Sequence, residues 1–287
     1  MELNYVLIAM TILFASLIAF FNTYFKRTRR FKYRWITKNH FINLKWVINI
    51  IICTGFLIYF ISLRYVYNVN DFIHLKGGVY NIPSNDVDLY FRSATISKTF
   101  LLDWCPWMSI LICLVGIIDF KQEVLPLFGF AAFVFGIITI VGGLLFQEII
   151  ERETFSMYLF TGIAPNRIYF AMHFFMVIYG MYTFTNLRTV KSLSLLFFHL
   201  ILIGYIIYVN ALGHALKVVN NLSGFASGDY YTGIYQQYKT IGDFLGQNPL
   251  INGYIISLFV YIILLLGIYI RFKIAKLISK KFDIHYY

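Results

Sequence analysis

Cys105 and His173 are the two residues of this sequence whose types could carry out acyl-transfer chemistry. Cys105 lies within an apolar run at residues 101–107, and His173 lies within an aromatic-rich run further along the chain. A cysteine thiolate attacks acyl carbonyls, and a neighbouring histidine transfers the proton. Pro106 is favoured at the first position of a helix. A helix that begins there makes Cys105 its N-cap, where the helix dipole favours a thiolate.

Both residues also have a structural interpretation. A free cysteine is commonly a small buried hydrophobic side chain. His173 follows Tyr169 by four residues, so a hydrogen bond along one helix face could satisfy its ring. The sequence therefore leaves a catalytic pair and two packing residues as alternatives. Cys53 and Cys113 lie deeper in apolar sequence with no base nearby and are predicted to pack. The spacing of the three cysteines fits neither a metal site nor a disulfide framework.

Polar residues near the ends of other apolar runs could bind a substrate beside this pair. We predict that role for Arg64, Asp103, Asn210 and His214, because ionisable residues inside membrane-spanning sequence are hypotheses of function by default. The alternative is that Asp103 and Arg64 pair across helices, and that Asn210 and His214 are ordinary polar residues where a span becomes a loop. No metal site and no cofactor are predicted.

The elements that position these residues are predicted to be membrane helices. Apolar residues make up 60% of the 287 residues and charged residues 13%, with a mean hydropathy of +0.71, whereas soluble proteins carry roughly 25% charge. The expected fold is an all-α bundle in one integral membrane domain, 1–287. The first apolar run is too long for a signal peptide and is predicted to be a retained span. Seven runs approach the roughly 20 residues that a span needs; they lie near 3–25, 46–66, 99–118, 124–146, 168–187, 193–215 and 253–272.

The distribution of basic residues predicts an orientation. Lysines and arginines concentrate in 26–45 and after Tyr269, and cytoplasmic loops carry the excess of such residues. The N-terminus is therefore expected outside and the C-terminus in the cytoplasm, in a multi-pass protein of the plasma membrane. This orientation puts Cys105 and His173 at matched depths, roughly 8–9 Å below the outer boundary at 1.5 Å per helical residue.

The net charge of +11 has a membrane explanation as well. Juxtamembrane basic residues meet anionic inner-leaflet lipid, and we expect this at the basic loop 26–45 and at the basic tail. Nucleic-acid binding is not expected, because it needs a soluble basic surface. Glycines crowd the predicted fourth span and indicate close helix packing there; they are Gly129, Gly136, Gly142 and Gly143.

Short motifs around these residues resemble the YwaF-type integral membrane proteins of low-GC bacteria. Residues 102–105 resemble the Leu-x-x-Cys element of that family, and His173 resembles the histidine at the head of a later span. Residues 229–231, 243–249 and Tyr254 resemble its motifs before the last span. The sequence differs from the family at Pro106, where an acidic residue is usual, and it lacks both tryptophans of the last motif.

The resemblance implies a seven-helix fold shared with vertebrate membrane proteins that move acyl chains between lipids. By that resemblance Cys105 is expected to be the nucleophile and His173 the general base of a lipid acyltransferase or lipid esterase, with membrane lipids as substrates. Two non-enzymatic alternatives stay open. One is a binding or transport subunit that holds a small polar solute in an outer cavity, and the other is a structural membrane partner.

Overall fold

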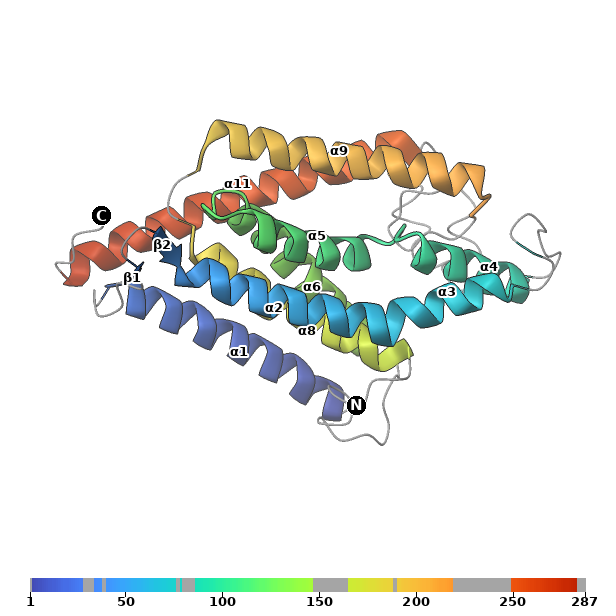
Figure 1. Ribbon diagram of the computed structural model, residues 1–287, viewed down its shortest axis with the longest axis horizontal. Coiled ribbons are helices and arrows are strands. Elements are labelled where there is room, and N and C mark those ends of the chain that lie inside the picture. The colour runs from blue at the N-terminus through green and yellow to red at the C-terminus, as the bar shows by residue number, and fades with distance from the viewer. Residues whose placement is uncertain are drawn as a thin grey trace. The chain divides into compact units, whose positions relative to one another are not determined.

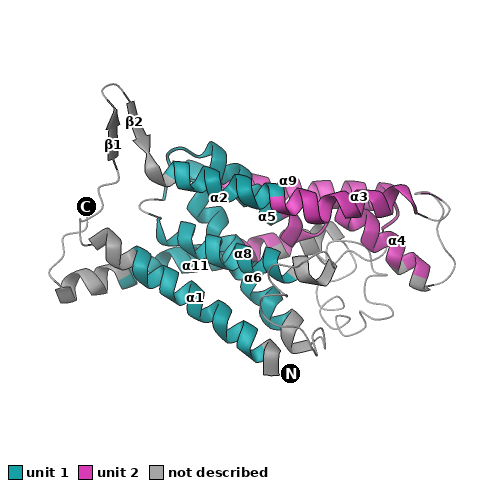
Figure 2. Cartoon of the chain, turned by 60° about the horizontal axis from the view of Figure 1, so that its bottom comes forward, with its two compact units in different colours: residues 1–58, 108–195, 262–287 teal, residues 59–107, 196–261 magenta. Residues whose placement is uncertain are grey.

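The computed structural model describes most of the chain in two compact units. The described residues are 2–27, 34–37, 40–75, 78, 86–146, 165–187, 190–218 and 249–282. Unit 1 consists of residues 1–58, 108–195 and 262–287, and unit 2 consists of residues 59–107 and 196–261 (Figure 2). The chain passes from one unit to the other within long helices.

The described chain is helical, as predicted, with one short hairpin. Residues Arg34–Thr37 (β1) and His40–Asn43 (β2) pair as an antiparallel hairpin, with Arg34 opposite Asn43. The helices in Figure 1 are α1 (Glu2–Arg27), α2 (Leu44–Phe60), α3 (Val66–Ile73), α4 (Asp86–Thr99), α5 (Trp104–Ile118), α6 (Leu125–Phe146), α8 (Pro165–Thr185), α9 (Ser192–Ala215) and α11 (Pro249–Phe282). A π-helical turn, η1 (Ile61–Tyr65), joins α2 to α3 without a break in helical backbone.

Six stretches of described helix are long and apolar enough to cross a membrane. They are Tyr5–Asn22, Trp46–Ile73, Phe91–Ile118, Leu125–Gly142, Ser192–Ala215 and Ser257–Ile274. These match six of the predicted spans, and the protein is a membrane protein by this measure. The predicted fifth span coincides with α8, whose apolar part Phe170–Thr185 is shorter. The third stretch begins earlier than predicted, because it includes much of α4.

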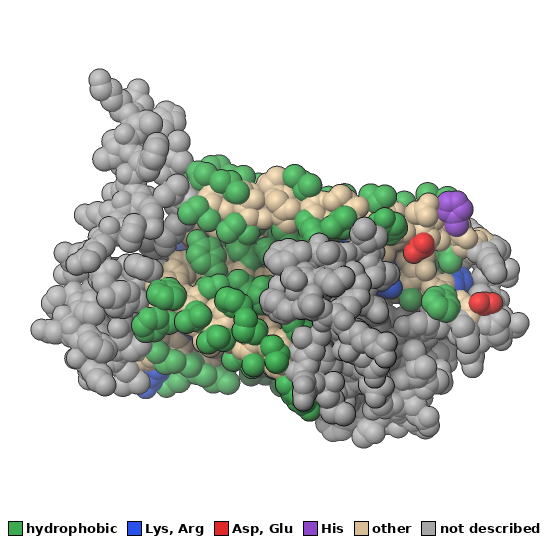
Figure 3. Space-filling view, turned by 90° about the horizontal axis from the view of Figure 1, so that it is seen from below, with side chains coloured by type: hydrophobic (Ala, Val, Ile, Leu, Met, Phe, Trp, Pro, Cys, Tyr) green, Lys and Arg blue, Asp and Glu red, His purple; other side chains and the backbone are tan. Residues whose placement is uncertain are grey.

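Large apolar side chains on these helices point outward. Ile51 on α2 is 66% exposed and Leu193 on α9 is 75% exposed, and hydrophobic side chains cover much of the described surface on the face in Figure 3. A soluble monomer rarely exposes so much contiguous apolar surface. Lipid is the solvent that suits these outward faces.

Unit 1 is built around the close packing of α6 and α8. Its core joins α1, α6 and α8 through Leu7, Ile140, Phe170 and Val177. Glycine permits the close approach: a Cβ on Gly180 of α8 would lie 2.5 Å from the backbone oxygen of Gly129 on α6. Gly136 is similarly crowded, whereas Gly142 has no neighbour within 4 Å of such a Cβ. The predicted packing role of the fourth-span glycines is therefore confirmed at Gly129 and Gly136 but not at Gly142.

The C-terminal end of α8 is closed by donors from two other helices of unit 1. Arg271 of α11 donates to the carbonyl oxygens of Thr185 and Leu187 at 2.7 and 2.9 Å. Asn22 of α1 donates to the carbonyl oxygen of Tyr182 at 3.0 Å. The last carbonyls of a helix have no partner within the helix itself. Side chains far away in sequence therefore fix where α8 ends.

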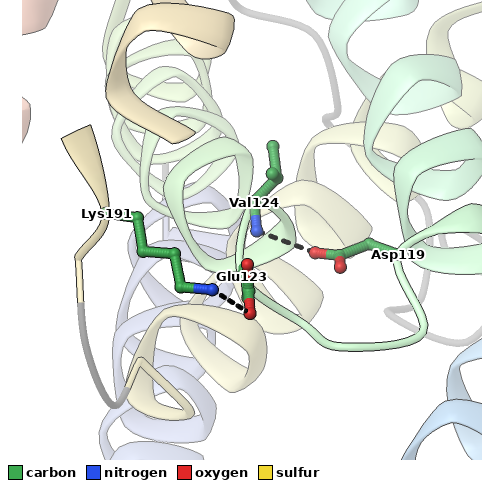
Figure 4. A network of polar contacts seen from close by, with 4 residues as sticks. All are labelled: Asp119, Glu123, Val124 and Lys191. Carbon is green, nitrogen blue, oxygen red and sulfur yellow. Dashed lines mark hydrogen bonds and ion pairs between the residues drawn. The ribbon is translucent and has the colours of Figure 1, made fainter. Parts of the chain in front are cut away.

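Acidic side chains stabilise the connection between α5 and α6 and join it to the residue before α9 (Figure 4). The Asp119 carboxylate accepts from the backbone N–H groups of Val124 and Leu125, each at 2.8 Å, and so caps the first turn of α6. Glu123 pairs with Lys191 at 2.6 Å. Both members of that pair are partly exposed, so its contribution to stability is small.

Candidate functional site

A break between α4 and α5 organises the polar residues of unit 2. Helix α4 ends at Thr99, and Leu101 adopts a left-handed conformation with φ of 54°. The N–H of Leu102 then donates to the carbonyl oxygen of Ser97 at 2.8 Å, which is the hydrogen bond that closes a helix end before a left-handed residue. Bulky residues seldom adopt this conformation. The break lies inside the candidate span Phe91–Ile118.

Two tyrosines of α9 satisfy the backbone at this break. The Tyr205 hydroxyl donates to the carbonyl oxygen of Leu102 at 2.8 Å, and the Tyr208 hydroxyl donates to that of Phe100. The Tyr205 ring also stacks on Trp107, with ring centroids 4.2 Å apart. Non-helical backbone is tolerated at membrane depth only where protein groups or trapped water satisfy it. The tyrosines provide those groups here.

Lys98, in the last turn of α4 before the break, lies within electrostatic range of three other charged residues. The charges of Arg64, Asp71 and Asp103 all interact with that of Lys98. We call Arg64, Asp71, Lys98 and Asp103 the charged cluster. Asp103 directly precedes α5 and is only 7% exposed. A carboxylate at that position is favoured by the positive end of the helix dipole.

Arg64 is presented by the π-helical turn. Its guanidinium lies 5.5 Å from the centroid of the Phe60 ring, within the range of a cation–π interaction. Single π-helical turns inside longer helices occur frequently at functional sites, because the extra residue redirects neighbouring side chains. In the same region the Thr99 hydroxyl donates to the carbonyl oxygen of Asn68 at 3.0 Å, which joins α3 to α4.

Neither unit by itself contains the predicted pair of Cys105 and His173. Cys105 is half-buried in the first turn of α5 and belongs to unit 2, whereas His173 is 1% exposed in the middle of α8 in unit 1. The predicted N-cap at Cys105 is wrong. Helix α5 begins at Trp104, so Cys105 is its second residue and Pro106 its third. The proline is still tolerated, because the first-turn N–H groups have no partner within the helix.

Only two of the four predicted substrate-binding residues belong to the charged cluster. Arg64 and Asp103 join the charged cluster. The Asn210 amide instead donates to the Ile206 carbonyl oxygen on its own helix at 2.8 Å. His214 is exposed in the last turn of α9. That helix end is closed by Arg92, which donates to the carbonyl oxygens of Leu216 and Lys217.

Lys98 and Asp71 are members of the cluster that the sequence interpretation missed. The predicted second span ends at 66 and the third begins at 99, so the sequence predicts both residues in an extracytoplasmic loop. The spacing of Arg64 and Asp71 was an available signal, since residues seven apart share a helix face. The motif at 229–231 and most of that at 243–249 lie outside the described residues. Within the described residues, no three His, Cys, Asp or Glu side chains are grouped to hold a metal ion.

Comparisons with known proteins give relatives along most of the chain. An uncharacterized MG135 homolog of Mycoplasma pneumoniae is 28% identical over 178 residues, 61% of this chain and 58% of that protein. The uncharacterized protein MG135 of Mycoplasma genitalium is 26% identical over 190 residues, 64% of this chain and 66% of that protein. The matches thus span less than two thirds of either relative. No solved structure matches the chain significantly. The profile of a family of unknown function, DUF5378, matches residues 6–287, and the chain therefore belongs to that family.

Proposed function

We propose that the protein binds a small polar solute at the break between α4 and α5, as a binding or transport subunit of the membrane. The observation that carries this proposal is the charged cluster beside an interrupted span. Charged residues inside membrane-spanning sequence are expensive to place there and commonly mark the pathway of a substrate or ion. Interrupted helices build many solute sites in membrane transporters, because the ends of the half-helices present dipole charge.

The composition of the cluster favours a solute that carries both charges. Arg64 and Lys98 are cations, and Asp71 and Asp103 are anions. A zwitterion such as an amino acid or a betaine would pair its carboxylate with the cations and its ammonium group with the carboxylates. An amino acid would make charge-assisted hydrogen bonds through both of its charged groups and a betaine through its carboxylate alone, and such bonds are about twice as strong as neutral ones.

A binding screen tests this proposal. Purified protein is heated with and without amino acids, glycine betaine, inorganic phosphate or glycerol, and the Tm is measured. At least one zwitterion is expected to raise the Tm of the wild type, and glycerol is not. The shift should be smaller in Asp103→Asn and unchanged in Lys191→Gln, which removes an exposed ion pair in unit 1. A panel in which no zwitterion stabilises the wild type, or an undiminished shift in Asp103→Asn, contradicts the proposal.

A second candidate function is lipid acyl transfer or ester hydrolysis by Cys105 and His173. Its support is that Cys105 is half-buried in the first turn of α5, where a thiolate is favoured by the helix dipole, together with the resemblance to YwaF-type proteins. Cys105→Ala and His173→Ala should then abolish turnover of labelled lipid in membranes, while Cys113→Ala retains it. Unchanged lipid turnover in both catalytic variants would contradict acyl transfer and would leave the solute proposal intact.

The number of spans and the orientation of the chain in the membrane are also part of the proposed function. We propose seven spans in the plasma membrane, counting α8, with the N-terminus outside and the basic tail against anionic lipid of the inner leaflet. Alkaline phosphatase is active only outside and green fluorescent protein is bright only inside the cell. Fusions of the two reporters at the C-terminus should therefore give fluorescence and no phosphatase activity. The opposite pattern would overturn the orientation.

A further inference from the structure

Unit 1 brings two cysteines that are far apart in sequence into contact. Cys53 of α2 and Cys113 of α5 are both fully buried, and the two thiols interact electrostatically. The Cys53 thiol also lies 3.1 Å from the hydroxyl oxygen of Tyr179 on α8. Both cysteines are free thiols. Three helices therefore meet at a dithiol beside a phenol.

Gly116 leaves the space that this arrangement needs. A Cβ at Gly116 would lie 2.7 Å from the Cys53 sulfur and 2.7 Å from the Tyr179 oxygen. Atoms at that separation overlap, so any larger residue at 116 would push the Cys53 thiol or the Tyr179 hydroxyl away. Gly116 is also one helical turn from Cys113 on α5. The dithiol thus rests on a close approach of α2 to α5.

We propose that Cys53 and Cys113 are a redox site that an apolar hydroperoxide, such as an oxidised lipid, converts into a disulfide. The oxidant class follows from the position of α2. Its outer face carries exposed Ile51 and Ile52 next to Cys53 in sequence, so a molecule dissolved in lipid comes within one helix thickness of the thiols. Polar oxidants partition poorly into that region.

The chemistry balances in two steps. The Cys53 sulfur attacks the terminal oxygen of the hydroperoxide, the O–O bond breaks, and the products are a sulfenic acid on Cys53 and an alcohol. The Cys113 sulfur then attacks the sulfenic sulfur, an S–S bond forms, the S–O bond breaks, and water leaves. The two thiols are oxidised, the hydroperoxide is reduced to the alcohol and water, and the two thiol protons leave in those products.

Cys53 is the better attacking residue because the Tyr179 hydroxyl oxygen lies 3.1 Å from its sulfur. A thiolate there would accept a hydrogen bond from that hydroxyl, and the thiolate is the nucleophilic form of cysteine. Cys113 then lies in position to resolve the sulfenic acid. A disulfide bond is about 2 Å long, so closure requires a side-chain rotation that shortens the contact between the two sulfurs.

The test uses the wild-type chain in membranes with cumene hydroperoxide as the apolar probe and hydrogen peroxide as the polar control. After oxidation the protein is denatured, its free thiols are labelled with a maleimide, and its peptides are analysed by mass spectrometry. We expect a linked peptide containing Cys53 and Cys113 and full reversal by dithiothreitol. Cumene hydroperoxide should act at lower concentration than hydrogen peroxide.

Two variants separate the roles of the cysteines. In Cys113→Ala the sulfenic acid on Cys53 has no resolving thiol and should be trapped by dimedone. In Tyr179→Phe the linked peptide should form more slowly, although the dithiol remains. The proposal is overturned if Cys53 and Cys113 stay labelled after oxidation that consumes Cys105. It is equally overturned if the only disulfides join two copies of the chain.

Discussion

The hydroxyl of Tyr205 donates a 2.8 Å hydrogen bond to the carbonyl oxygen of Leu102, more than one hundred residues earlier in the chain. That carbonyl lies at the break between α4 and α5, and the hydrogen bond is buried. The same tyrosine ring packs against Trp104 and Trp107 at the start of α5. One side chain of α9 thus holds both the backbone of the break and the first turn of the helix that follows it.

Replacing Tyr205 by Phe should therefore destabilise the protein while the aromatic packing remains. The variant leaves a buried carbonyl without its donor, which costs about 1–3 kcal/mol. Tyr208→Phe is the matched control. It removes the hydrogen bond to the Phe100 carbonyl oxygen, but Tyr208 is exposed, so that loss should cost less stability. Thermal unfolding should show a larger fall in Tm for Tyr205→Phe. An equal or smaller fall would show that Tyr205 does not hold the break.

The left-handed residue at the end of α9 predicts a substitution that stabilises the protein. Lys217 has φ of 50°, and Val218 N–H donates to the Gly213 carbonyl oxygen in the turn that closes the helix. Glycine adopts this conformation without the penalty of roughly 1–2 kcal/mol that a Cβ brings. Lys217→Gly should raise the Tm, and Lys217→Ala, which keeps the Cβ, should not. A glycine variant no more stable than the alanine variant would contradict the strained conformation.

Removal of the Arg271 guanidinium should loosen the end of α8. Arg271→Met keeps most of the side-chain volume but removes the donor to the Thr185 and Leu187 carbonyl oxygens. We expect the free energy of unfolding to fall by about 1–3 kcal/mol. Arg271→Lys should recover only part of it, because an ammonium group cannot reproduce the planar fork. Lys273→Met, an exposed neighbour on the same helix, should leave the Tm nearly unchanged. A similar fall in Tm for Lys273→Met would show that the loss of positive charge, and not the loss of the Arg271 hydrogen bonds, lowers the stability.

The close packing of α6 against α8 predicts strong sensitivity at Gly180. A Cβ there would meet the Gly129 oxygen at 2.5 Å and the Phe133 nitrogen at 2.8 Å, both of them backbone atoms that cannot rotate away. Overpacking of this kind typically costs about 1–3 kcal/mol. Gly142→Ala on α6 meets nothing within 4 Å and should be neutral or stabilising. Equal unfolding temperatures for the two alanine variants would argue against the close approach.

The spans could be predicted from sequence because each depends on local properties. Length and hydropathy act along one run of residues, so the apolar stretches of α1, α6 and α9 were located to within a few residues. The membrane orientation and the seventh span stay predictions. The basic side chains of 26–45 and those after residue 274 lie outside the described side chains.

The site was harder to predict because its parts meet only in the folded chain. No glycine or proline occupies the break at Leu101. Its backbone is hydrogen-bonded by Tyr205 and Tyr208, which lie more than one hundred residues later in the chain. Pro106 favours a helix that begins at residue 106, but α5 begins two residues earlier at Trp104, so the expected N-cap at Cys105 is wrong. Cys53 and Cys113 were correctly placed in the interior, yet their contact depends on the approach of α2 to α5.

The most direct test of solute binding at the charged cluster is a dissociation constant. Kd for the zwitterion that most stabilises the wild type is measured by isothermal titration calorimetry, and the measurement is repeated for Asp103→Asn, Arg64→Gln and the exposed control Asp88→Asn. Loss of one charge-assisted contact should weaken binding about tenfold or more in the first two variants and leave Asp88→Asn like the wild type. Equal Kd values in all four proteins would contradict binding at this cluster.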